Sequence, residues 1–247
     1  MKEFTPTYTA THRVIPQDCD FTAHMRPAAL LSCTQQVGTD HCISFGLDSS
    51  VHARTHTAFL LAKQALEFYR VPAVNETLTF VSRPEGARRA VYKRVHEVLD
   101  ESGALVARVD SRWVLVDTES RRILRRPPEE LALPWPERVE EELDLTIHKA
   151  AELSEPVEQV ARYSLCDENG HLNNAKWVDV LCDALPTEVL AAGPVRRVAV
   201  NYHWEVPMGQ AFTLRWGRTE GGYYFCGQRE ERSCIEAELC FGDLTEL

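Results

Sequence analysis

Apolar and polar positions form a pattern that occurs twice along the chain. Two apolar-rich stretches, residues 28–45 and 175–192, each precede a series of shorter apolar runs. In the second stretch, Trp177, Leu181 and Ala184 recur at i, i+4 and i+7, which is typical of a helix with one buried stripe. The shorter runs predict antiparallel strands, at residues 66–82 and 92–117 in the first half and at 200–216 and 223–243 in the second.

The repeat includes the segment before each predicted helix. Residues 20–28, DFTAHMRPA, align without gaps with residues 167–175, DENGHLNNA, and share Asp, His, a large apolar residue and Ala. Because a duplicated unit determines the fold, we predict an α+β protein with two hot dog domains. In each, a long central helix is wrapped by a curved antiparallel sheet. The predicted domains are residues 1–130 and 153–247, and the proline-containing, acid-rich segment 131–152 between them is a predicted linker.

Composition limits the class of protein. Apolar residues make up 44% and charged residues 26% of the 247, which is typical of a globular protein. No apolar run approaches the roughly 18 residues of a membrane span, and the start MKEFTPTYTATHRV lacks the pattern of a signal or transit segment. We therefore expect a soluble, cytoplasmic protein, either a monomer or a homodimer. The net charge of −10 argues against a nucleic-acid partner.

The cysteines predict neither disulfides nor a metal site. The eight cysteines are scattered, with no C-x-x-C pair and no Cys/His cluster at zinc spacing. We expect reduced, mostly buried thiols and no metal or cofactor. Cys166 stays open as a nucleophile because it lies beside His171 in sequence, although its apolar neighbours favour a small core side chain.

Residues 165–177, LCDENGHLNNAKW, carry the densest group of polar side chains. An ordinary surface turn would also account for them. However, Asp167, Asn169 and His171 alternate, and in extended backbone that spacing points all three to one side. The aspartate can orient the histidine or hold the loop, the asparagine can donate to a developing oxyanion, and the histidine can move a proton.

Two further features concern the helix that follows this loop and a carboxylate more distant in sequence. Asn173 or Asn174 is expected to cap the helix that follows, where unpaired N–H groups can polarise a carbonyl. Glu205 ends an apolar strand before a proline turn, an unusual place for a carboxylate unless it faces solvent or a site. Where the second half has Asn169, Asn173 and Asn174, the first half has Thr22, Arg26 and Pro27. In place of Glu205 the first half has Arg70 or Val71.

At these residues the chain resembles the acyl-ACP thioesterase family of plants and bacteria, which has tandem hot dog domains. LCDENGHLNNAKWVDVL is similar to the family's D-x-N-x-H-x-N-N-x-K-[YW] signature, and NYHWEVPMG resembles its E-Y-R-x-E strand. SRWVLVDTESRRILRRPPEE resembles the segment that closes the first domain. The resemblance covers about residues 8–243, and the first motif is the most specific of the three.

The resemblance implies hydrolysis of the thioester between a fatty acyl chain and the phosphopantetheine of acyl carrier protein. Asp167, Asn169 and His171 match the signature's catalytic positions, and Glu205 matches the acid on the later strand. The family often has cysteine directly after that acid, whereas this chain has Val206. Direct attack by water, assisted by Glu205 and His171, is therefore the expected mechanism.

Substrate binding and carrier docking are also predicted. Asn173 and Asn174 are expected to contact the substrate, and first-half residues are expected to line an acyl channel, among them Phe59, Phe68 and Trp113, with Leu60 and Leu61. Because acyl carrier proteins are acidic, basic residues could steer one toward the site. The docking candidates fall into two groups: Arg83, Arg88 and Arg89 with Lys93 and Arg94, or Arg121 and Arg122 with Arg125 and Arg126. A solvated hairpin edge is the alternative explanation for these charges.

Three other functions stay open at this point. An acyl-CoA thioesterase would use the same groups on another carrier. A non-catalytic hot dog module would bind acyl thioesters as a sensor, so that its polar loop serves recognition alone. A dehydratase also fits a hot dog with His and Asp, but it would need no second acid such as Glu205.

Overall fold

A computed structural model describes residues 3–137 and 141–242. The helices are α1 (Pro27–Ser44), α2 (Ser49–Thr55), α3 (Lys176–Asp183) and α4 (Thr187–Ala192), with short 3₁₀ turns η1 (Pro16–Asp18), η2 (Glu129–Leu131) and η3 (Tyr163–Leu165). The strands are β1 (Tyr8–Arg13), β2 (Thr57–Phe68), β3 (Thr77–Arg88), β4 (Val91–Leu99), β5 (Leu105–Asp117), β6 (Val157–Val160), β7 (Val195–Tyr202), β8 (Ala211–Arg218), β9 (Gly222–Arg229) and β10 (Arg232–Phe241). None of the helices among these residues is long and apolar enough to cross a membrane.

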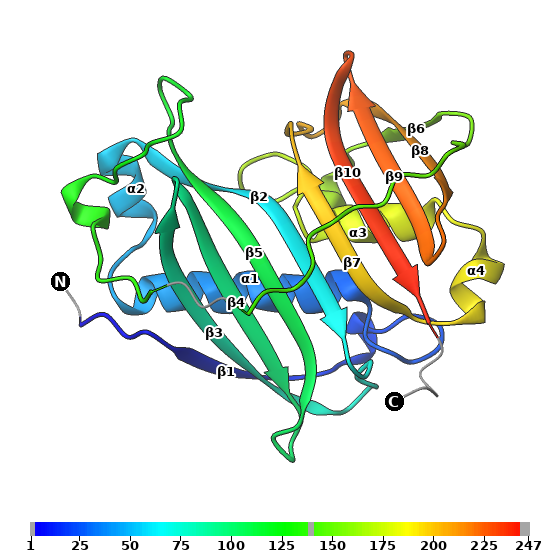
Figure 1. The fold of residues 1–247 in the computed structure, drawn as a ribbon, viewed down its shortest axis with the longest axis horizontal. Helices are drawn as coiled ribbons and strands as arrows, with labels where there is room; N and C mark the ends of the chain where they lie inside the picture. The colour runs from blue at the N-terminus through cyan, green and yellow to red at the C-terminus, as the bar shows by residue number, and fades with distance from the viewer. Residues whose placement is uncertain (1–2, 138–140, 243–247) are drawn as a thin grey trace.

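The described strands form one antiparallel sheet that contains the repeat. Its order is β1-β3-β4-β5-β2-β7-β10-β9-β8-β6, so the second five strands mirror the first five. The halves meet where β2 pairs with β7, from Lys63 opposite Asn201 to Glu67 opposite Arg197. Helix α1 lies against the first half of the sheet and α3 against the second (Figure 1). The predicted α+β arrangement of two sheet-wrapped helices is confirmed.

Helix α1 closely matches its prediction over residues 28–45. Pro27 occupies its first turn, where the missing N–H costs nothing because that group has no partner inside the helix. Ala28, Leu30 and Leu31 are buried with Val37 in the main apolar core. A helix that is apolar on most sides suits a position where a curved sheet surrounds it.

The second central helix is shorter than predicted. The apolar pattern predicts a helix over 175–192, but α3 ends at Asp183 and α4 begins at Thr187. Pro186 lies between them. Proline has no N–H for a helical hydrogen bond and biases the preceding residue away from the helical region, so the helix breaks there. The expectation of a long helix in the second half is wrong.

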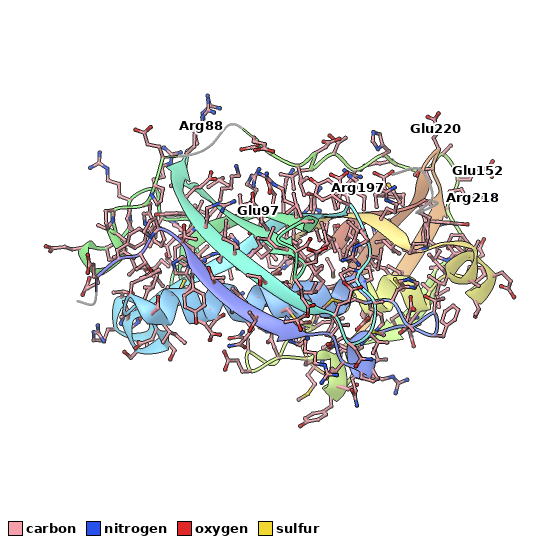
Figure 2. The ribbon with its side chains drawn as sticks, turned by 90° about the horizontal axis from the view of Figure 1, so that it is seen from below. Arg88, Glu97, Glu152, Arg197, Arg218 and Glu220 are labelled. Atoms are coloured by element: carbon pink, nitrogen blue, oxygen red, sulfur yellow. The ribbon has the colours of Figure 1, made fainter. Side chains whose placement is uncertain are left out.

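The second part of the predicted linker crosses the outer face of the sheet, the side opposite the helices. Figure 2 shows this segment passing along the side of the sheet where Glu97 and Arg197 lie, away from α1. We call residues 141–154 the linker strap. The Leu143 N–H donates to Asp110 Oδ2 at 3.1 Å, and Arg197 Nη2 donates to the carbonyls of Asp144 and Thr146 at 2.9 and 2.7 Å.

Buried charges on this outer face hold the strap. Lys93, Arg108, Asp110 and Arg112 are at most 6% exposed. Arg108 Nη2 donates to the Glu141 carbonyl at 2.9 Å, and Arg112 Nη2 lies 2.9 Å from Glu142 Oε2. Buried ions require such partners because an unpaired charge is costly in a low dielectric.

Two of the predicted docking residues, Lys93 and Arg94, are buried. Lys93 faces the strap and is 1% exposed, while Arg94 faces α1 on the other side of the sheet and is 8% exposed. Their successive positions on β4 send them to opposite faces, since side chains alternate along a strand. The expectation that Lys93 and Arg94 belong to a docking surface is wrong.

Candidate active site

The polar loop is a tight turn closed by Asp167. The Asp167 N–H donates to the His171 carbonyl at 3.0 Å, and the Gly170 N–H donates to the Asp167 carbonyl at 2.9 Å. Gly170 has φ of +74°, a left-handed conformation that glycine adopts without strain. The Asp167 carboxylate accepts hydrogen bonds from the Asn169 N–H at 3.0 Å and from Asn173 Nδ2 at 3.2 Å. The carboxylate thus holds the loop, which is one of the two roles considered for it.

The turn brings His171 to Glu205. The Leu172 N–H donates to the Val206 carbonyl at 2.9 Å, which ties the loop to the segment that follows β7. In consequence His171 Nδ1 lies 3.5 Å from Glu205 Oε2, with side-chain exposures of 31% and 58%. This distance allows an ion pair, and both groups are open to solvent. Two residues that are far apart in sequence are therefore within ion-pair distance of each other.

Asn173 caps the helix entrance. Its Oδ1 accepts from the Ala175 N–H at 2.9 Å and from the Lys176 N–H at 3.4 Å, and the Trp177 N–H donates to its carbonyl at 3.1 Å. The first turn therefore begins at Asn173, just before α3. Asn174 instead uses its carbonyl to accept from the Tyr202 hydroxyl at 2.9 Å. Because Asn173 occupies two of the first helical N–H groups, they are not free to polarise a substrate carbonyl.

The first half contains the same turn without the acid. The Asp20 N–H donates to the His24 carbonyl at 2.9 Å, repeating the contact of Asp167 with His171. His24 pairs with Ala73 as His171 pairs with Pro207. The equivalent of Glu205 is therefore Val71, two residues before Ala73, and it is 4% exposed.

Two first-half substitutions have structural consequences that the sequence pattern did not indicate. Thr22, in place of Asn169, donates from Oγ1 to Asp20 Oδ1 at 2.6 Å and lies 3.0 Å from His24 Nδ1. Arg26, in place of Asn173, forms an ion pair with Asp179 of α3. Arg26 thus ties the two halves together, a contact that only the tertiary structure could reveal.

Cys166 packs beside the loop as a thiol. Its Sγ–H donates to the Ala161 carbonyl at 3.8 Å, and the side chain contacts the main apolar core. Partial burial and the Asp167 carboxylate raise the pKa of the Cys166 thiol. A raised pKa disfavours the reactive thiolate. Packing therefore accounts for Cys166 better than nucleophilic attack. Among the described residues no group of His, Cys, Asp and Glu is arranged to hold a metal ion.

The predicted channel residues lie in two places. Phe68 is fully buried in the main core. Phe59 and Trp113 pack instead in a second cluster near α2, where the Phe59 ring lies edge-on to Tyr92 with centroids 5.1 Å apart. Leu60, in contrast, is 41% exposed.

The predicted docking arginines lie far from this loop. Arg88 and Arg89 are exposed at the β3–β4 tip, and Arg121 and Arg122 are exposed after β5, whereas Arg83 pairs with Glu97. The β3–β4 tip is at the end of the molecule that holds α2, away from α3 (Figure 1).

Basic residues next to the candidate site were not singled out from the sequence. The Arg232 guanidinium lies 4.5 Å from the ring centroid of Trp204, which is 51% exposed and directly precedes Glu205. Arg162 is exposed at the start of the polar loop. The sequence signal for this group would have been Trp204, an aromatic residue directly before Glu205 at the end of a strand.

Two models of one protein family match successive parts of the chain. The family model for the acyl-ACP thioesterase N-terminal domain matches residues 5–133, and the one for the C-terminal domain matches residues 138–232. The chain belongs to the acyl-ACP thioesterase family. An oleoyl-acyl carrier protein thioesterase of Arabidopsis thaliana is 23% identical over 198 residues, which are 69% of this chain and 52% of the relative. The chain therefore spans about half the length of the curated relatives it matches.

Solved structures of this family have the same fold. A Lactobacillus plantarum protein described as an oleoyl thioesterase is 22% identical, with a TM-score of 0.84 over 96% of this chain and 97% of its own. An acyl-ACP thioesterase from Bacteroides thetaiotaomicron is 17% identical, with a TM-score of 0.79 over 96% and 98%. At these identities the likeness shows the fold, a tandem hot dog.

Proposed function

We propose that the protein hydrolyses the thioester of fatty acyl-acyl carrier protein and releases the fatty acid and the free carrier thiol. The observation that carries the proposal is the pairing of His171 with Glu205 beside the entrance of α3. The first half keeps the turn and a histidine but has Val71 in place of the acid. If both turns were only structural, neither would need an acid at this position. A protein with one hydrolytic centre would keep the acid in one half only, as observed here. Membership of the acyl-ACP thioesterase family supports the same chemistry.

In this mechanism Glu205, assisted by His171, takes a proton from a water molecule as the water oxygen bonds to the thioester carbonyl carbon. The Asn169 side-chain amide polarises the carbonyl oxygen, which carries the developing negative charge. The carbon–sulfur bond then breaks, and the carrier thiolate leaves and regains a proton. Asp167 acts on none of the reacting atoms and keeps the turn closed.

Single substitutions test these roles. Glu205→Ala and His171→Ala should each lower turnover at least ~100-fold, the typical contribution of a positioned acid or base. The matched control is His24→Ala, which removes the equivalent histidine of the first-half turn and should leave turnover within a few-fold. The measurement is fatty-acid release from a ladder of acyl-ACPs, including oleoyl-ACP, with acyl-CoAs of the same chains alongside. Near-normal hydrolysis by Glu205→Ala would eliminate the water-activation role.

Charge reversal tests where the acidic carrier docks. Arg162 is exposed just before the polar loop and Arg232 lies over Trp204, the neighbour of Glu205, so reversing both to Glu should raise KM for acyl-ACP about tenfold through lost electrostatic complementarity. The same variant should leave KM for a small acyl thioester unchanged. Reversal of Arg88 and Arg89 is the matched comparison. If that pair raises KM instead, docking lies at the β3–β4 tip, as predicted from the sequence.

A further inference from the structure

A buried cation without a carboxylate lies inside the first half. Arg94 is 8% exposed between β4 and α1. Its Nη1 donates to Ser82 Oγ at 2.8 Å and to His41 Nδ1 at 3.2 Å, and its Nη2 donates to Cys42 Sγ at 3.2 Å. All three acceptors are neutral or weak. None of the ion pairs found among the described residues includes Arg94.

The opposite face of the same strand shows what a structural cation looks like here. Lys93, the preceding residue, is also buried, but its Nζ lies 3.3 Å from Glu85 Oε2 and 3.7 Å from Glu142 Oε1. Since a buried charge is normally compensated by a carboxylate or metal, Arg94 stands out. Its charge is available to something other than the protein's own acids.

His96 adds donors that lack an acceptor. It is 4% exposed, and both ring nitrogens are buried without a hydrogen-bond partner among the described residues. An imidazole always carries at least one N–H, so one unsatisfied donor is unavoidable. Gly38 of α1 faces the same point. A Cβ built there would lie 3.6 Å from His96 Nε2 and 3.5 Å from Arg94 Cδ, which is ordinary contact, so a small group fits beside both.

The surrounding groups keep Arg94 as the dominant charge. Burial lowers the pKa of His41 to about 4, and the Arg94 guanidinium lowers it as well. Burial, then Arg94 and His41, lower the pKa of His96 well below its ordinary value. Both imidazoles are therefore neutral at pH 7, and the cluster presents one positive charge and an imidazole donor.

A polar row connects this cluster to the candidate active site. On the inner face of the sheet Arg94 lies opposite Ser111, and Ser111 lies opposite Gln64. Gln64 Oε1 is 3.4 Å from the Tyr202 hydroxyl, which is 2.9 Å from the Asn174 carbonyl at the entrance of α3. An interior that held only hydrocarbon would gain nothing from these groups, since buried polar atoms cost free energy without partners.

We propose that the Arg94 cluster, formed by Arg94, His96, His41 and Ser82 beside Gly38, binds an oxygen atom carried by the acyl chain of the substrate. The chain would bear a hydroxyl, oxo or carboxylate group, each able to accept from the guanidinium and the imidazole. This rests on the proposed hydrolysis, in which the thioester lies at the polar loop. Gly38 is roughly 18 Å along α1 from Arg26, at 1.5 Å per residue, and Arg26 pairs with Asp179 of α3, the helix that begins at the polar loop. The oxygen would therefore be remote from the thioester.

Ligand binding tests the inference without relying on catalysis. Octadecanoic acid and a positional series of its hydroxylated derivatives are titrated into the intact protein, and the affinity is followed by thermal shift and calorimetry. One hydroxylated isomer should bind about tenfold more tightly than the unsubstituted acid, the scale of one hydrogen bond to a charged donor. Arg94→Met and His96→Phe should each abolish that preference. The matched control Arg83→Met, on the outer face of β3, should keep it.

Two further measurements make the outcome decisive. Gly38→Ala favours the helix and fills the space beside His96 Nε2, so it should remove the preference in a folded protein even if Arg94→Met does not fold. Equal affinity for all acids, or a preference that survives Arg94→Met and Gly38→Ala, overturns the proposal. Stabilisation by chloride or phosphate that requires Arg94, with no preference among the acids, also overturns it and assigns the cluster to a free anion.

The same variants separate this inference from the proposed function. If hydrolysis is absent from every acyl-ACP but the hydroxylated acid still binds through Arg94, the hydrolytic function fails and the binding site stands. If plain acyl-ACPs are hydrolysed and the selectivity for oxygenated chains is missing, the hydrolytic function stands and the proposed binding site fails. The ratio of kcat/KM for hydroxylated over plain acyl-ACP should fall about tenfold in Arg94→Met.

Discussion

Asn173 shows how one side chain can set the geometry of a whole site. Its Oδ1 caps the first turn before α3, and its Nδ2 donates to the carboxylate of Asp167. The helix and the polar loop are therefore joined through one amide, and neither a pure acceptor nor a pure donor could make both contacts. Arg26 occupies the equivalent place in the first half and binds Asp179 instead. The same position thus builds a site in one copy and an inter-half contact in the other.

Substitution at Asn173 should separate its two contacts. Asn173→Ala loses the cap and should lower the free energy of unfolding by about 1 kcal/mol. Asn173→Asp keeps an acceptor at the cap but places a second carboxylate against Asp167, so it should retain more stability than Asn173→Ala while opening the turn. Urea denaturation and fatty-acid release measure the two effects. Asn174→Ala, whose described contact uses only the backbone, should change stability by less than about 0.5 kcal/mol.

The linker strap is the element that explains the buried charges of the outer face. Lys93, Arg108 and Arg197 donate to its backbone carbonyls, and Asp110 accepts from its Leu143 N–H. A segment without regular structure can lie on a sheet only if its backbone polar groups find such partners. The strap in turn shields the ion pairs from water. Strap and sheet charges therefore stabilise each other.

Removing Asp110 should release the strap. Asp110 is fully buried between Arg108, at 3.0 Å, and Arg112, at 3.9 Å. Asp110→Ala leaves both arginines without this carboxylate and should cost about 3–5 kcal/mol of unfolding free energy. It should also accelerate protease cleavage within residues 141–154. Glu141→Ala is the matched control, because the Glu141 side chain pairs with Arg108 but is 79% exposed, and it should cost less than about 1 kcal/mol. Equal effects of the two changes would contradict the assignment.

At the scale of the whole molecule, one sheet and the main apolar core join the two halves, so acid sensitivity in the first half should affect global stability. His41 and His96 are neutral in the folded state because burial, with Arg94 nearby, lowers the pKa of each. In the unfolded state they titrate near about 6.5. As pH falls from about 6.5 toward about 4, the unfolded state therefore binds more protons than the folded state, and the free energy of unfolding decreases.

The pH dependence should depend on His96. Urea denaturation should show that the free energy of unfolding decreases as pH is lowered from about 7.5 to about 5. In His96→Phe the slope of this free energy against pH should be smaller, by an amount equivalent to up to about one bound proton. This window lies above the range of carboxylates such as Glu76 and Glu236, whose pKa values are lowered by hydrogen bonds to Arg70 and Lys149. The control is His56→Asn, since His56 is exposed and Asn tolerates its left-handed φ of +51°. An unchanged slope in His96→Phe would refute this account.

Much of the architecture could be predicted because it depends on local pattern. The repeat of DFTAHMRPA in DENGHLNNA indicated two copies, apolar periodicity placed α1, and the apolar run over 92–117 predicted the strands β4 and β5. The length of the second helix was predicted less well. Pro186 was visible in the sequence, but the apolar spacing around it continued, so the break depended on backbone chemistry that periodicity does not register.

The sequence by itself determined the duplicated α+β fold, the polar loop and the family to which both belong, because periodicity, turn chemistry and motif spacing are local properties. Only the tertiary structure decided what those residues meet. It paired the first-half His24 with Ala73, so that Val71 takes the place of Glu205, directed Lys93 to the strap and Arg94 to α1, and left both ring nitrogens of His96 without a hydrogen-bond partner among the described residues. Alternation along a strand assigns two faces, but which face is covered, and by what, depends on segments far apart in the chain.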